Sequence, residues 1–321
     1  MEQRLLTRAD TPILVALWNR IFGPQFPIDE AVWTYCTWGA PGFESGDAVV
    51  VWDGAAPAAF AVAKPWRLRP IGHVDSSVGF ISALGVDPVY GGRDLGAALL
   101  DWAEGWLRQH HAQTVVLGHD LQPFFCGVPQ AFNARGFFER FGYTYGHTVY
   151  DVTRDLAGYQ RHPSALQTEK RLGNRLELRP ARRGDVKDLL DFLAETFPGR
   201  WRFELTTYFD RGGPASDVMI ARLDGRVEGF AHLHSPGTPF LAYGLNWRNA
   251  VTPPAGGLGP IGVSERVRGE GLGLALLDAG LDVLAQRGTR GCVIDWTTLL
   301  DFYGKVGFQP WRAYDGMTRT L

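Results

Sequence analysis

The hydrophobic and polar positions of this chain form a pattern that occurs twice. Residues 84–100 (LGVDPVYGGRDLGAALL) and 261–277 (IGVSERVRGEGLGLALL) each read as an apolar strand, a glycine-rich turn and a helix with apolar residues at i, i+3 and i+4. Matching blocks follow in the same order, FFERFGY (137–143) and FYGKVGF (302–308), each typical of a helix end, a glycine stop and an aromatic entry into a strand. A repeat of this length predicts two domains of the same fold.

The same periodicity predicts the elements of each half. In the first half we expect helices near 10–22, 28–38, 95–110 and 128–141, and strands near 47–53, 56–64, 76–86, 113–118 and 143–152. In the second half we expect helices at 184–197, 201–211, 272–287 and 297–306, and strands at 176–180, 217–223, 226–234, 258–263, 290–295 and 308–319. This order predicts a mixed α/β (α+β) fold. The expected boundaries are 1–154, a linker or bridging helix at 155–175, and 176–321.

Composition limits the classes of function. With 321 residues and 45% hydrophobic positions, the chain has enough apolar material for two cores. A formal net charge of −2 argues against a broad nucleic-acid surface. Cys36, Cys126 and Cys292 are far apart and form no CxxC pair, so we expect neither a disulfide framework nor a zinc site. Since neither a signal peptide nor a long apolar run is apparent, we expect a soluble cytoplasmic protein without a membrane partner.

The turn at residues 268–273 (RGEGLG) carries the clearest candidate chemistry. It joins a predicted strand to a helix, whose first turn has unpaired backbone N–H groups and the positive end of the dipole. Glycines let the backbone approach a phosphate closely, and Arg268 adds a charged donor. These features predict a pyrophosphate site. The turn alone is also compatible with a dinucleotide site or a plain tight turn.

Two blocks at a fixed spacing resemble a known family. Arg268, Gly271 and Gly273 fill the three fixed positions of the [Q/R]-x-x-G-x-[G/A] motif of the GNAT acetyltransferase superfamily, and FYGKVGF (302–308) resembles that family's FYxKxGF block. Because both halves carry related blocks, the chain resembles a tandem GNAT protein. The resemblance implies two domains, each with a central, twisted, mostly antiparallel sheet flanked by helices. It also implies acetyl-CoA as co-substrate and no metal.

The resemblance assigns roles to particular residues of the second half. It implies that the coenzyme contacts Ile261, Val263, Arg268, Gly269, Glu270, Gly271, Leu272, Gly273 and Tyr303. The Val263 N–H would stabilise charge on the thioester oxygen, and Tyr303 would protonate the departing thiolate. Tyr303 is also compatible with a role as an aromatic core residue.

The family fixes no position for the general base. Asp295, at the end of a predicted strand, and Glu265, near the end of the Val263 strand, are both candidates. Either could instead be a solvated charge or a helix cap. The sequence also departs from the family at Trp296, where an asparagine is common seven residues before the tyrosine. The usual coenzyme contact near that point is therefore not expected.

The first half departs from the motif at three positions. Gly91 stands in place of Arg or Gln, Asp94 in place of a glycine, and Phe138 in place of Tyr303. A carboxylate among phosphate-facing amides should repel a pyrophosphate. We therefore expect a catalytically degenerate domain with, at most, a weaker second CoA site at Val86, Gly92, Arg93, Leu95 and Gly96.

Together these features predict an acyl-CoA-dependent N-acyltransferase that transfers acetyl to a small-molecule amine by direct attack, catalysed by the second half. We expect a monomer or homodimer that binds no nucleic acid. A non-catalytic CoA sensor or scaffold and a nucleotide-binding oxidoreductase are the alternatives. Aromatic residues at Trp33, Tyr35 and Trp38, and at Trp201, Phe203 and Tyr208, fit either an apolar acceptor cleft or core packing.

Overall fold

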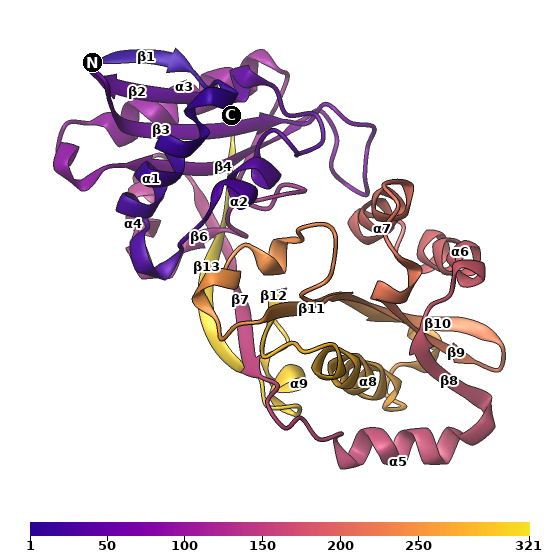
Figure 1. The fold of residues 1–321 in the computed structure, drawn as a ribbon. Coiled ribbons are helices and arrows are strands. Elements are labelled where there is room, and N and C mark those ends of the chain that lie inside the picture. Colours follow the sequence, from indigo (N-terminus) through magenta and orange to yellow (C-terminus); the bar gives the residue numbers. More distant parts are fainter. The chain divides into compact units, whose positions relative to one another are not determined.

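The structure is a computed structural model that describes residues 1–321, apart from the side chains of Pro24 and Tyr243. The chain forms two compact units (Figure 1). Unit 1 comprises Met1–Tyr150 and Arg312–Leu321, and unit 2 comprises Asp151–Trp311. The two halves of the sequence repeat therefore fold into two separate bodies.

The sheet of unit 1 has the strand order β1-β2-β3-β4-β5-β13-β7, and the short strand β6 pairs with β13. The strands of this unit are β1 (Glu2–Leu5), β2 (Ala48–Asp53), β3 (Ala56–Pro65), β4 (Val78–Val86), β5 (Thr114–Leu117), β6 (Val128–Pro129), β7 (Thr144–Asp155) and β13 (Gln309–Thr320). Its helices are α1 (Thr11–Ile21), α2 (Glu30–Cys36), α3 (Leu95–Gln109) and α4 (Arg135–Arg140). β4 and β5 pair in parallel, whereas β1 with β2, β2 with β3, β3 with β4, and β13 with β5 pair antiparallel, so the sheet is mostly antiparallel.

Unit 2 repeats this plan with the order β7-β12-β11-β10-β9-β8. Its further strands are β8 (Leu176–Pro180), β9 (Val218–Leu223), β10 (Arg226–His234), β11 (Ala255–Val263) and β12 (Gly291–Thr297). Its helices are α5 (Pro163–Leu172), α6 (Val186–Thr196), α7 (Arg200–Asp210), α8 (Leu272–Gln286) and α9 (Leu300–Gly304). Figure 1 shows α6 and α7 on one face of this sheet and α8 on the other.

The division of the chain differs from the predicted boundaries at two places. The last strand was expected to complete the second half, but Thr318 of β13 pairs with Val116 of β5, and residues 312–321 belong to unit 1. The segment 155–175 was expected to be a linker or bridging helix, and it contains α5, which belongs to unit 2. Strand exchange of this kind follows from long-range pairing, which a local hydrophobic pattern does not encode.

The predicted elements occur at the expected places, with one clear exception. A helix was expected over 128–141, whereas the chain forms β6 and then the shorter helix α4. Pro129 is the second residue of β6, and because it has no backbone N–H it cannot donate a hydrogen bond inside a helix. The core of unit 2 between the sheet and helices α6 and α7 is built from alternating strand residues and helix faces, including Leu189, Phe192, Leu193, Leu205, Ile220 and Phe230.

Among the residues that the structure describes, no helix has both the length and the apolar character needed to cross a lipid bilayer.

The C-terminal strand should contribute measurably to the stability of unit 1. Arg319 on β13 donates to Glu104 of α3 at 2.7 Å, and the Glu104 carboxylate, 4% exposed, also accepts from the Tyr143 hydroxyl at 3.1 Å. Replacing Arg319→Met leaves this buried carboxylate with only the longer ionic contact to Arg108, at 3.5 Å, so we expect a loss of about 2 kcal/mol in the free energy of unfolding, measured in urea. The control Arg135→Met breaks the exposed pair with Glu139 and should cost less than about 0.5 kcal/mol. If both variants lost the same small amount of unfolding free energy, the contact of β13 with Glu104 would not stabilise unit 1.

Candidate active site

The two parallel strands of unit 2 pair over only a short length. Ala255, Gly256 and Gly257 of β11 pair with residues 291–293 of β12, and beyond this point β11 runs on to Val263 paired with β10 alone. The edge of β11 that faces away from β10 is therefore left without a ladder partner between residues 258 and 263. Such an opening exposes backbone groups to a ligand.

The direction of these backbone groups follows from one hydrogen bond. The amide of Ser264 donates to the carbonyl oxygen of Glu228 on β10 at 2.8 Å. Because successive N–H groups of a strand point to opposite edges, the amides of Val263 and Ile261 point away from β10 and into the opening. The two strand residues singled out from the sequence thus present donors to the same gap.

The glycine-rich turn continues directly from this strand. Gly269 and Gly271 both have φ of +83°, in the left-handed region that favours glycine, and α8 begins at Leu272. Arg268, Gly269 and Glu270 are exposed, whereas the Leu272 side chain is buried. The amides of residues 272–274 lie in the first helical turn, which has no intrahelical acceptors. The residues predicted to face a phosphate, with Gly273 half-buried among them, therefore lie on one turn that is largely accessible to solvent.

Two ionisable side chains lie close together beyond the point where the strands separate. Asp295 is on β12 and Tyr303 on α9; Tyr303 is 6% exposed and hydrogen-bonds the Thr297 side chain. Burial raises the pKa of the Tyr303 phenol well above its usual range, and the charge of Asp295 acts in the same direction. The phenol thus keeps its proton at neutral pH and can donate it.

Asp295 has the properties of a base poised for neutral pH. Burial raises its pKa to about 7, and the nearby carboxylate of Asp151 adds to the shift. The side chain also adjoins the opening, because a methyl group at Gly259 of β11 would lie 3.2 Å from Asp295 Oδ1. A base with a pKa near the working pH combines a useful ionised fraction with a strong drive to take a proton.

The second base candidate has a different environment. Glu265 has an 82% exposed side chain and pairs with Arg268 at 3.0 Å, so it lies beside the glycine-rich turn. Of the two carboxylates, Asp295 is the one that the structure brings to the strand opening. The guanidinium of Arg200 lies 4.4 Å from the Trp296 ring centre, at the position where the family commonly has asparagine.

Sequence reasoning missed two histidines beside this site. His232 and His234 of β10 are buried, and His234 Nε2 lies 2.9 Å from the carbonyl oxygen of Gly259. Burial lowers the pKa of both rings, so both are neutral at pH 7. Alternate histidines in a strand match no motif, and only the pairing of β10 with β11 brings them here.

Among the described side chains, no group of three His, Cys, Asp or Glu residues could hold a metal ion.

Unit 1 has the same backbone plan with different side chains. β4 and β5 pair from Val78↔Thr114 to Ile81↔Leu117 and then separate. Gly92 and Asp94 adopt φ of +75° and +55° at the places of Gly269 and Gly271. Arg93 lies beside Tyr90, and Leu95 begins α3 with Gly96 behind it. Val86 ends β4, so the five residues of the predicted second site lie along one strand end and turn.

The opening in unit 1 encloses a cavity of about 240 Å³. Its walls are largely apolar and include Phe22, Ser82, Leu84, Val86, Gly118, Phe125, Phe132 and Phe138. When the parallel strand pairs of the two units are aligned, Gly118 of unit 1 corresponds to Asp295 of unit 2. The sequence repeat places Phe138 at the position of Tyr303. This half therefore has space at the strand opening without the two ionisable groups.

The raised pKa of Asp295 predicts a pH-dependent stability difference. The carboxyl titrates near pH 7 in the folded protein but near pH 3.9 when unfolded. Its contribution to the free energy of unfolding is therefore most favourable below about pH 4, and it is lost as the pH rises through about 7. The free energy of unfolding of Asp295→Asn, measured in urea, should therefore be close to that of the wild type at pH 4.5. At pH 8 we expect the variant to be more stable by about 1–2 kcal/mol. The exposed Asp301→Asn serves as control. A gain that is the same at both pH values would contradict the shift.

Known proteins with the same architecture include three solved structures. A GCN5-related glucosamine N-acetyltransferase region of a fungal multi-domain GH3 β-N-acetylglucosaminidase is 25% identical, with a TM-score of 0.88; the match covers 99% of this chain, which spans only 38% of that one. A GCN5-related N-acetyltransferase from Sphaerobacter thermophilus is 19% identical, with coverage of 99% and 95% and a TM-score of 0.73. A tandem GNAT protein from the clavulanic acid biosynthesis pathway is 15% identical, with coverage of 99% and 98% and a TM-score of 0.66.

No match was found among the curated proteins. The model of the acetyltransferase (GNAT) family, in contrast, matches residues 14–143 and 186–308. These ranges fall one in each half and together cover most of the sequence. The chain therefore belongs to the acetyltransferase (GNAT) family, as a tandem protein that carries the GNAT fold twice.

Proposed function

We propose that this protein transfers the acetyl group of acetyl-CoA to the amine of an amino sugar, and that unit 2 carries out the reaction. The observation that carries the proposal is the coincidence of Asp295 and Tyr303 with the strand opening and the phosphate-facing turn in one unit. The pyrophosphate of CoA would lie on the amides that follow Arg268. The thioester would lie against the free edge of β11 at Ile261 and Val263.

The proposed reaction is a direct transfer. A protonated amine gives one proton to Asp295, and the neutral nitrogen then attacks the thioester carbonyl carbon. The Val263 amide stabilises the charge on the carbonyl oxygen while the C–N bond forms. The C–S bond breaks, the thiolate takes the Tyr303 proton, and one of the two protons still on the nitrogen restores the phenol, which leaves the other on the amide. The products are an N-acetyl amine, CoA and a protonated Asp295.

Two observations support an amino sugar as the acceptor. The fungal region described above as a glucosamine N-acetyltransferase is similar over 99% of this chain. The surroundings of Asp295 also suit a cationic amine, because the charges that act on it include the carboxylates of Asp151 and Glu204 as well as the guanidinium of Arg200. A protonated amine would relieve the repulsion between these carboxylates.

Unit 1 is proposed as a second CoA site without chemistry. Its cavity lies at the strand opening, and its turn keeps the left-handed backbone at Gly92 and Asp94. It lacks a carboxylate at Gly118 and a phenol at Phe138. The Asp94 carboxylate should weaken phosphate binding relative to unit 2. A protein that only senses CoA remains the alternative for the whole chain, and turnover distinguishes the two.

Substitutions at the two ionisable groups test the proposed reaction. With acetyl-CoA and glucosamine, we expect Asp295→Asn to lower kcat by about 100-fold or more, and Tyr303→Phe by about 10- to 100-fold, since positioned acid–base groups contribute on this scale. Thiol release measured with a disulfide dye gives the rates. Glu265→Gln is the control and should keep kcat within about twofold. Full turnover in both site variants would exclude the proposed roles, and no turnover of the wild type with any amine would favour the CoA sensor.

The stoichiometry of CoA binding tests the division of roles between the units. Calorimetric titration should give two CoA molecules per chain, one weaker than the other. Ala83→Leu places a larger side chain on the wall of the unit 1 cavity, so it should remove one of the two and leave turnover within about twofold. Loss of turnover in a folded Ala83→Leu protein would instead assign the chemistry to unit 1.

A further inference from the structure

Helix α5 lies outside the family's sequence blocks but packs against the helix that carries the phosphate-facing turn. Its buried residues Ala165, Thr168 and Leu172 recur at helical spacing and define one face. Figure 1 shows α5 beside α8 in unit 2. The segment before α5 is bonded to a buried carboxylate of α8, and the C-terminal end of α5 contacts the glycine-rich turn.

The beginning of this segment is anchored on a buried carboxylate. Asp278 of α8 is fully buried, and it accepts from the Tyr159 hydroxyl at 2.6 Å and from the His162 amide at 2.8 Å. The Arg161 guanidinium donates to it as well, and also pairs with Glu169. A buried charge with several donors holds its partners firmly, because breaking any contact leaves a desolvated carboxylate.

The other end of α5 reaches the glycine-rich turn. Arg171 donates to the carbonyl oxygen of Glu270 at 2.5 Å. A methyl group at Gly271 would come within 2.5 Å of Thr168 Oγ1, so α5 packs directly against the turn. Gly271 is therefore required twice, for its positive φ and for the space that Thr168 occupies.

The contact with Arg171 fixes the orientation of a single peptide plane. In a trans peptide the carbonyl oxygen and the following N–H point in opposite directions. With the Glu270 oxygen held by Arg171, the Gly271 amide must point away from α5, toward the exposed side of the turn. A cation on the carbonyl also polarises that peptide and strengthens the N–H as a donor.

We infer that Arg171 is a positioning residue for the coenzyme, which holds the Glu270–Gly271 peptide in the orientation that binds the pyrophosphate. The inference rests on the proposed function, because it takes the turn to be the CoA site. It adds a residue from the segment between the two sequence repeats to that site. Arg171 acts from behind the turn, whereas Arg268 is on the turn itself and pairs with Glu265.

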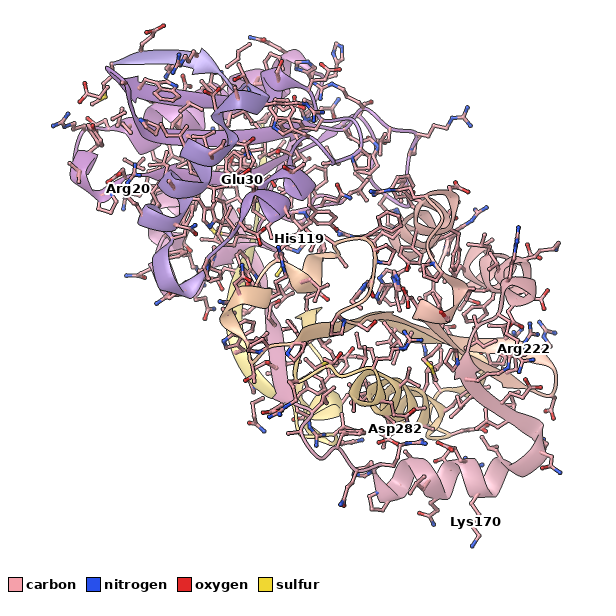
Figure 2. The ribbon with its side chains drawn as sticks, viewed as in Figure 1. Arg20, Glu30, His119, Lys170, Arg222 and Asp282 are labelled. Atoms are coloured by element: carbon pink, nitrogen blue, oxygen red, sulfur yellow. The ribbon has the colours of Figure 1, made fainter. Side chains whose placement is uncertain are left out.

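The test compares acetyl donors that contain a pyrophosphate with one that lacks it. In the full-length protein, Arg171→Ala should raise the KM for acetyl-CoA by about 5- to 20-fold and leave kcat within twofold, since only coenzyme binding is affected. With S-acetyl-pantetheine, which lacks the pyrophosphate, the same variant should have the KM of the wild type. Arg171→Lys keeps a hydrogen-bond donor at this position, so its KM for acetyl-CoA should lie between those of the wild type and Arg171→Ala. Lys170→Ala is the matched control, because Lys170 is exposed and points away from α8 (Figure 2).

Further measurements separate the possible outcomes. Acetyl-dephospho-CoA should show the same loss as acetyl-CoA, and a loss that disappears with it would overturn the inference in favour of a direct contact with the 3′-phosphate. An unchanged KM, or an equal loss with S-acetyl-pantetheine, would also overturn it. CoA affinity measured by calorimetry without turnover tests Arg171 independently of the reaction. Wild-type protein that binds CoA but transfers no acetyl group would therefore contradict the proposed function alone.

Discussion

The separation of two parallel strands is the constraint on which the rest of this protein depends. In each unit the parallel pair is hydrogen-bonded over only a few residues, and then one strand continues with a free edge. Unpaired backbone donors in a protein interior are costly unless something binds to them. Under the proposed function, the amide and carbonyl groups of the coenzyme's pantetheine arm would satisfy this edge. The turn and both ionisable groups of unit 2 lie around the same opening.

The two units differ in chemistry much more than in backbone. Both turns have left-handed residues at equivalent places, and Asp94 adopts this conformation where unit 2 has Gly271. Asp and Asn tolerate that region better than most side chains, so the turn persists despite the substitution. Burying a carboxylate at Asp295 raises its pKa and costs stability at neutral pH, and unit 1 avoids this cost with glycine at the equivalent place.

Support for the site comes from parts of the chain that the motif does not contain. Asp278 anchors the segment before α5, and α5 in turn packs on the back of the glycine-rich turn. On the other side of the sheet, His234 contacts the carbonyl oxygen of Gly259 where β11 departs from regular pairing. The candidate site, assembled from a strand, a turn and a helix, is thus held in place by neighbouring residues outside the motif.

The sequence by itself determined the repeat, nearly all of the helices and strands, and the place of the glycine-rich turn, because these depend on local periodicity and on spacing within a few residues. The same local spacing led to the prediction of site roles for Arg268, Gly271 and Tyr303. It left Asp295 and Glu265 undecided, since the difference between them is burial, which depends on packing rather than on neighbours in sequence. Only the tertiary structure decided that the last strand belongs to unit 1 and that Arg171 reaches the turn, because both depend on contacts between residues roughly 100 or more positions apart.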